Sequence, residues 1–158
     1  MIRIKKSSIV FLTITLLTGA SCVIHSLING ENSFAVSDYI VNLIIKYIHP
    51  TTNIHTIRSI TALVRKLAHF SEYALLFSFF NCFMISHTSY KNKALVFVTL
   101  FALIFLPLID ETVQYFSPGR SPMVYDIWID AVGGAVGIII SGLIYYIVRK
   151  IRISRKNS

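Results

Sequence analysis

The sequence predicts an all-α integral membrane protein with four transmembrane helices and one amphipathic interfacial helix. Two features of the composition indicate this class: 54% of the 158 residues are hydrophobic and only 14% are charged, against about a quarter charged in a typical soluble domain. A third is that the apolar residues fall into runs of roughly 20, the length that crosses about 30 Å of hydrocarbon. A chain of this length has room for one domain, so residues 1–158 are expected to form a single transmembrane domain.

The first predicted span covers residues 9–28 and follows a basic N-terminal segment. A cleaved signal peptide is the alternative, because the run from Gly19 to Cys22 resembles a lipoprotein cleavage site. Gly19, however, stands where such sites prefer a branched apolar residue, and the apolar run is longer than the usual core of a signal peptide. We therefore expect an uncleaved span.

The longest segment between predicted spans, residues 29–61, contains an amphipathic helix over Ser37–Pro50. Polar side chains recur in it every three or four residues. The residues that lie largely away from this polar stripe are Tyr39, Ile40, Leu43, Ile44 and Tyr47. Pro50 is expected to end the helix, because proline cannot continue the hydrogen-bond ladder. Such a helix, which is part of the first outer segment, is suited to lying in the headgroup interface of the membrane. Packing against the spans is the alternative.

Three further spans are predicted at about residues 67–86, 94–114 and 125–148, and a helical pattern from Thr52 leads into the first of them. Pro107 should kink the helix one turn before two carboxylates, or else mark only the helix end. In the last span, small residues recur at helical spacing, which lets another helix approach closely. These packing residues are Gly133, Gly137 and Ser141.

The distribution of Lys and Arg predicts the orientation. Placing the N-terminus in the cytoplasm puts ten of the fifteen on the cytoplasmic side and five outside. Both termini are therefore predicted to be cytoplasmic. In a soluble protein the net charge of +8 would suggest that the protein binds nucleic acid. Here most cations flank apolar runs, so we expect membrane lipids and no nucleic acid as partners.

Four of the seven acidic residues lie between Asp110 and Gly137. A carboxylate costs about 2.5–3.5 kcal/mol at the centre of a membrane helix and less near its ends, so several together indicate a function. Lys66, His69 and Tyr73 share one face of an earlier helix, and the predicted topology brings them to the same outer side. The candidate ligand-binding residues are Lys66, His69, Glu72, Tyr73, Asp110, Glu111, Gln114, Arg120, Asp126 and Asp130.

At these residues the chain resembles the VanZ-like family of small bacterial membrane proteins. The matching motifs are Lys66-x-x-His69-Phe70-x-Glu72-Tyr73, Asp110-Glu111-x-x-Gln114, Pro118-Gly119-Arg120 and Asp126-x-x-x-Asp130-x-x-Gly133-x-x-x-Gly137. Some members carry Asn at the position of Asp130, so the carboxylate here departs from the pattern. The resemblance implies a place in the bacterial cell membrane and a link to resistance to the glycopeptide teicoplanin. The resemblance does not indicate which reaction, if any, the protein catalyses.

Two functions stay open. In the first, the cluster binds a ligand, a cell-wall precursor or lipid-linked molecule for example, or forms a structural polar network. In the second, the protein is a membrane-embedded enzyme that acts on a lipid-linked or peptidoglycan-related component by acid–base or metal-assisted chemistry. The catalytic candidates are then His69, Asp110, Glu111 and Asp126.

The chemistry of the cluster also leaves its ligand open. Lys66 or Arg120 would suit an anionic group, whereas the carboxylates with His69 would suit a divalent cation. The motifs of zinc proteases, α/β-hydrolases and phosphate-binding loops are absent from the sequence. The sequence therefore does not identify a substrate or an oligomeric state.

Overall fold

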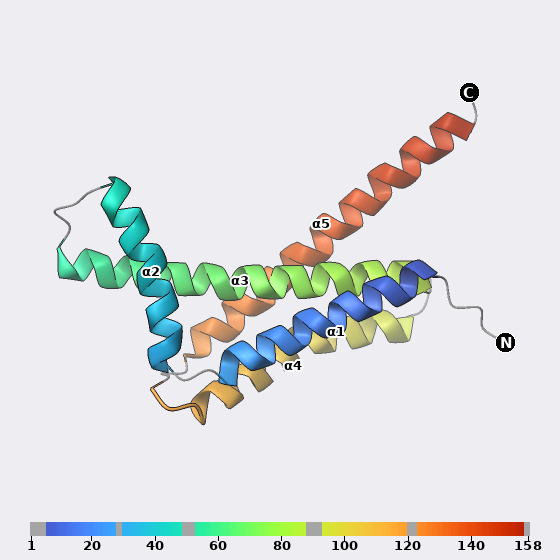
Figure 1. Cartoon of the computed structure of the whole chain (residues 1–158). Coiled ribbons are helices and arrows are strands. Elements are labelled where there is room, and N and C mark those ends of the chain that lie inside the picture. The colour runs from blue at the N-terminus through green and yellow to red at the C-terminus, as the bar shows by residue number, and fades with distance from the viewer. Residues whose placement is uncertain (1–5, 28–29, 49–52, 88–92, 120–122, 157–158) are drawn as a thin grey trace.

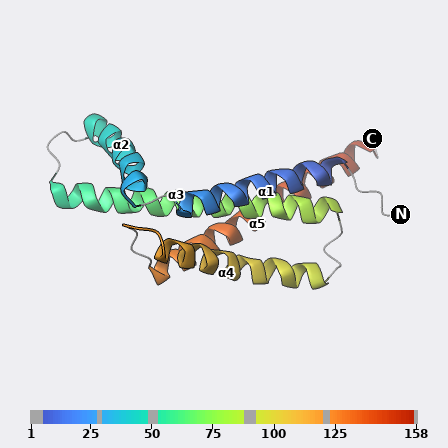
Figure 2. The same ribbon diagram turned by 60° about the horizontal axis from the view of Figure 1, so that its bottom comes forward.

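The computed structural model describes residues 6–27, 30–48, 53–87, 93–119 and 123–156. Within these ranges it has five helices: α1 (Lys6–Leu27), α2 (Gly30–Ile48), α3 (Ile54–His87), α4 (Lys93–Tyr115) and α5 (Val124–Lys156). α1 lies along α3 and also contacts α4, α5 crosses the bundle obliquely in contact with α3 and α4, and α2 lies across the first turns of α3 (Figures 1 and 2). α1 begins and α5 ends at the same end of this bundle.

Three of these helices are long and apolar enough to cross a membrane, namely α1, α4 and the Val124–Arg155 part of α5. The prediction of an all-helical membrane protein is therefore confirmed. The remaining predicted span, residues 67–86, lies inside α3, which has 34 residues but is not among these three helices. Polar side chains such as His69, Glu72 and Asn81 lower the mean hydropathy of α3.

The described helices correct one predicted boundary, because α2 begins at Gly30, earlier than the predicted start at Ser37. α4 spans Lys93–Tyr115, close to the predicted residues 94–114, and continues through Pro107. This excludes the alternative that the proline marks only the helix end.

α2 packs against α3, which was one of the two alternatives for the amphipathic helix. The side chain of Val41 is fully buried, and the hydroxyl of Thr61 donates a hydrogen bond to Asp38 Oδ1 at 3.4 Å. Contact with α3 therefore accounts for one face of α2.

The most extensive helix pairing is that of α3 with α5. Gly133 and Gly137 lie directly on the α3 backbone, where an added Cβ atom would overlap the carbonyl oxygens of Phe70 and Ala74. The hydroxyl of Ser78 donates to the carbonyl of Gly137 at 3.0 Å. Small residues thus let the two backbones touch, as expected for close packing between membrane helices.

An apolar core covers this contact on the side of α1 and α4. Its buried members are Cys22, Tyr73, Leu76 and Phe77, with Phe80, Ala102, Leu103 and Ile138 packed around them. α3 therefore lies between α1 and α5 and carries the residues that face both.

Candidate functional site

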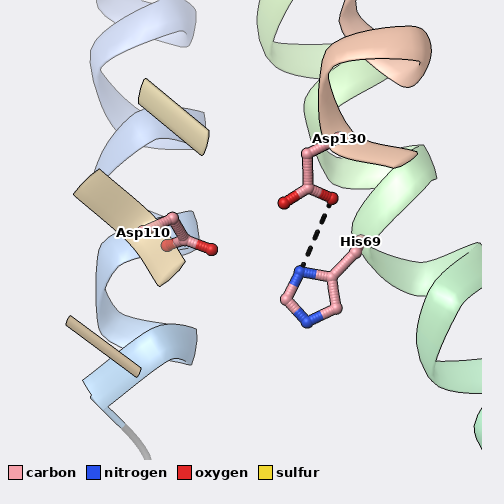
Figure 3. Close-up of side chains that lie close together, drawn as sticks. All are labelled: His69, Asp110 and Asp130. Carbon is pink, nitrogen blue, oxygen red and sulfur yellow. Dashed lines mark ion pairs between the residues drawn. The ribbon is translucent and has the colours of Figure 1, made fainter. Parts of the chain in front are cut away.

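Three buried side chains from three helices meet near the end of α1. His69 comes from α3, Asp110 from α4 and Asp130 from α5, and each offers one ligand atom within 4.8 Å of the other two. Figure 3 shows the three side chains directed toward one another. Their exposed fractions are 7%, 6% and 1%. We call them the His–Asp–Asp group.

The close contact of α3 with α5 brings His69 and Asp130 together. Gly133 lies against the backbone of Phe70, so the residues that precede each of them, Asp130 and His69, face each other across the same interface. Asp110 reaches the group from α4, one turn after Pro107. Its position therefore depends on how α4 packs against α1 and α5.

Two atoms of the group have no hydrogen-bond partner within the described residues, Nδ1 of His69 and Oδ1 of Asp130. They lie 3.8 Å apart, which is within range of an ion pair but too long for a hydrogen bond. Buried polar atoms are normally hydrogen-bonded, and the exceptions call for an explanation such as a bound ion. Hydrogen bonds among the described residues therefore do not satisfy every polar atom of the His–Asp–Asp group.

Asp110, in contrast, is held by neighbouring donors. Its Oδ1 accepts a hydrogen bond from the Ser26 hydroxyl, and its Oδ2 accepts one from Gln114 Nε2 at 3.0 Å. The hydroxyl of Ser117 in turn donates to the carbonyl of Ser26 at 3.0 Å. These contacts tie the end of α1 to the end of α4 and fix the carboxylate.

A second polar pair lies beside the group. His25 Nδ1 and Glu72 Oε1 are 2.8 Å apart and both side chains are partly exposed. The rings of His25 and His69 are stacked with their centroids 6.2 Å apart. Imidazole and carboxylate groups therefore continue from the buried centre toward the edge of the bundle.

The remaining predicted residues occupy different environments. Tyr73 is buried on α3 in the apolar core, stacked on Phe77. Lys66 lies on α3 one turn before His69 and is partly buried. Glu111 is buried and accepts a hydrogen bond from the backbone N–H of Met123, so it ties the end of α4 to the start of α5.

Asp126 and Arg120 complete the predicted set. Asp126 lies one turn before Asp130 on α5, partly buried, and its Oδ1 also has no hydrogen-bond partner within the described residues. Arg120 lies outside the described residues.

The sequence analysis did not identify His25 or Ser26 as candidate residues. Both lie at the end of the first apolar run, and Ser26 is 84 residues away from Asp110 in sequence. A histidine inside an apolar span is by itself a functional signal, and this signal would have pointed to His25.

The His–Asp–Asp group suits a divalent transition metal. One imidazole nitrogen and two carboxylate oxygens are the donors that Zn²⁺, Mn²⁺ and Fe²⁺ accept, and three protein ligands leave room for a further ligand. The two atoms that lack a hydrogen-bond partner belong to two of these three residues, so the residues present fit such an ion.

Comparison with known proteins gives one match. A family model described as VanZ/LLP1 matches residues 8–148, from the first turns of α1 to the later turns of α5, and this range contains the whole His–Asp–Asp group. No curated protein and no solved structure matches the chain.

Proposed function

The chain belongs to the VanZ/LLP1 family, and on that premise we propose that it is a protein of the bacterial cell membrane that binds a divalent metal ion at its His–Asp–Asp group. The main support is a pair of buried atoms beside Asp110, Nδ1 of His69 and Oδ1 of Asp130, which lie 3.8 Å apart and have no hydrogen-bond partner within the described residues. Leaving a buried polar atom unpaired costs roughly 1–3 kcal/mol, and more for a charged group. A bound cation would offset this cost for both atoms.

The donor set narrows the choice of ion. Ca²⁺ and Mg²⁺ prefer oxygen ligands only, whereas an imidazole nitrogen favours Zn²⁺, Mn²⁺ or Fe²⁺. Gln114 and Ser26, which donate to Asp110, resemble the outer partners that usually orient metal-binding carboxylates. We therefore favour a transition metal over calcium.

The proposal includes four spans with both termini in the cytoplasm. α3 lies between α1 and α5, and several of its polar side chains, His69 and Asn81 among them, are buried against other helices. Its mean hydropathy therefore understates how well its outer surface suits lipid. The excess of Lys and Arg on one side, ten of fifteen, supports the orientation.

Labelling with a membrane-impermeant thiol reagent tests this topology. In a protein without Cys22 and Cys82, the reagent should modify Met123→Cys in intact cells and should not modify Lys93→Cys until the cells are opened. Both positions are exposed, Met123 before α5 and Lys93 at the start of α4. The opposite pattern would place the His–Asp–Asp group nearer the cytoplasmic face.

In this orientation the metal site lies in the outer half of the membrane, where an anionic envelope component would complete the coordination of the ion. A contribution to teicoplanin resistance is the physiological part of the proposal, and the family resemblance supports it.

The alternative function is that of a metal-dependent enzyme. Asp126, with its unpartnered Oδ1 one turn from Asp130, is the candidate base, and turnover of a lipid-linked substrate by purified protein would favour the enzyme.

Metal binding by the purified protein tests the proposal directly. We expect about one Zn²⁺ or Mn²⁺ per chain in equilibrium dialysis, and an affinity at least about tenfold lower for Asp130→Asn, which keeps the shape of the side chain but removes its charge. Glu72→Gln is the matched control, because Glu72 pairs with His25 and lies outside the group. The same variants are then compared for teicoplanin susceptibility.

Each outcome has a defined meaning. Loss of both metal binding and resistance in Asp130→Asn, with both retained in Glu72→Gln, supports the whole proposal. A wild-type protein that binds none of Zn²⁺, Mn²⁺ or Fe²⁺ refutes the metal site. Full resistance with Asp130→Asn refutes the link between the site and the glycopeptide response.

A further inference from the structure

A groove lies between α1, α3 and α5 at the opposite end of the bundle from the His–Asp–Asp group. It includes Ser7 and Phe11 near the start of α1, whereas Ser26, at the other end of α1, contacts Asp110. Its volume is about 790 Å³, within the range of about 300–1,000 Å³ typical of sites for small molecules. The two features are therefore separate.

The groove arises because α5 leaves α3. Close contact through small residues ends at Ser141, and every residue from 143 to 155 is exposed. Figure 1 shows this part of α5 diverging from α1 and α3. The resulting space is lined mainly by apolar side chains such as Phe11, Ile144 and Val148.

Two arginines, Arg149 and Arg152, also line the groove. They are three residues apart on α5 and so share one side of the helix. The segments of sequence that contribute to the groove hold no acidic residue: there is none in residues 1–30, in 73–109 or after Asp130. An occupant that complements this surface carries negative charge at one end and hydrocarbon elsewhere.

We propose that the groove binds an anionic phospholipid, with its acyl chains against the apolar walls and its phosphate beside Arg149 and Arg152. The guanidinium group pairs with phosphate through two parallel hydrogen bonds. In the four-span topology this end of the bundle lies at the cytoplasmic leaflet, where anionic lipids are concentrated.

Charge disfavours the other occupants. A second copy of this chain packed on the same face would bring its own basic segment, which holds five Lys or Arg between residues 149 and 156. The N-terminal residues Arg3 and Lys5 carry the same sign. A lipid with a zwitterionic headgroup would offer the arginines a phosphate that its own ammonium partly neutralises.

Titration of the purified full-length protein in detergent tests the proposal, with bound lipid counted by native mass spectrometry. Phosphatidylglycerol should bind more tightly than phosphatidylethanolamine. The double variant Arg149→Gln/Arg152→Gln should raise the Kd for phosphatidylglycerol about 25-fold, since two cations near a lipid headgroup contribute about fivefold each. Lys150→Gln/Arg155→Gln removes the same charge from the same helix outside the groove and should leave the Kd nearly unchanged.

A second variant tests the apolar part without changing charge. Ile144→Trp fills the groove with a larger side chain and should reduce binding, whereas Ile140→Trp, on an exposed position of α5 outside the lining, should not. Equal effects of the two charge variants would mean that the basic segment attracts lipid without a site. Equal binding of the two lipids, or unchanged binding in Ile144→Trp, would also overturn the proposal.

Discussion

The two halves of α5 differ in what they contact. From Asp130 to Ser141 the helix carries small residues and one carboxylate, and its contact face is buried on the backbone of α3. From 143 to 155 the same helix carries bulky apolar residues and arginines, and every position is exposed. One continuous helix thus belongs to a packed bundle at one end and is exposed at the other.

The difference shows how a membrane protein of this size can hold charged groups in fixed positions. Hydrophobicity does not drive helices together in lipid, because lipid tails are as apolar as leucine, so association depends on close packing and hydrogen bonds. Gly133 and Gly137 supply that packing next to Asp130. The geometry of the His–Asp–Asp group therefore depends on residues that carry no functional chemistry themselves.

The largest expected effect comes from filling the close contact. Gly137→Leu should prevent stable assembly, since even a Cβ atom at Gly137 overlaps the carbonyl oxygen of Ala74 and lies 2.9 Å from Ser78 Oγ. Overpacking of this kind costs about 1–3 kcal/mol or more. Ile139→Leu, two residues on at a position that is 59% exposed, is the control and should leave stability unchanged. Yield and thermal stability in detergent measure both variants.

If Gly137→Leu matched Ile139→Leu in both measurements, α3 and α5 would not touch through this face. The contrast between the two halves of α5 would then be lost.

A matched pair of isoleucines tests the contrast with a smaller effect. Ile138 is partly buried against the apolar core, whereas Ile147 is exposed on the diverging half of α5. Ile138→Ala should lower the free energy of unfolding by about 2 kcal/mol, the low end for deleting a packed isoleucine side chain. Ile147→Ala should change it by less than about 0.5 kcal/mol. Denaturation of both variants in mixed micelles compares them, and similar losses would mean that the later turns of α5 are packed as well.

Most of the helices could be predicted from the sequence, because the length and periodicity of an apolar run are local properties. The boundaries were less certain. The early start of α2 at Gly30 was missed, since the residues before Ser37 lack a clear amphipathic pattern. α3 joins a polar segment to an apolar one in a single 34-residue helix. No proline or glycine separates the two parts, so the sequence does not indicate where the helix would enter a membrane.

The candidate site was only partly accessible to sequence reasoning. Charge counting placed His69, Asp110 and Asp130 on one side of the membrane, and the structure has them in contact range of one another. His25 and Ser26 were missed because their contacts come from tertiary packing of α1 against α3 and α4. The sequence also gave no indication of the groove, since it results from the direction in which α5 leaves the bundle.

The smallest expected effect lies at the point where α5 leaves α3. Asn81 Nδ2 donates hydrogen bonds to Ser141 Oγ at 2.8 Å and to the carbonyl of Ile138 at 3.1 Å. Hydrogen bonds between membrane helices average about 0.6 kcal/mol and reach about 1.7 kcal/mol. In a double-mutant cycle, Asn81→Ala and Ser141→Ala should therefore show a coupling energy of about 0.6–1.7 kcal/mol in the free energy of unfolding.

The same cycle locates the boundary between the two halves. Asn81→Ala also frees the Ile138 carbonyl, so it should destabilise the protein more than Ser141→Ala, whose hydroxyl contributes one side-chain contact to α3. A cycle between Asn81 and Tyr145, one turn beyond Ser141 in the groove lining, should give no coupling, because residues without a shared contact behave additively. Coupling to Tyr145 as strong as that to Ser141 would mean that α5 stays on α3 past Ser141, and the groove would then be narrower than the structure has it.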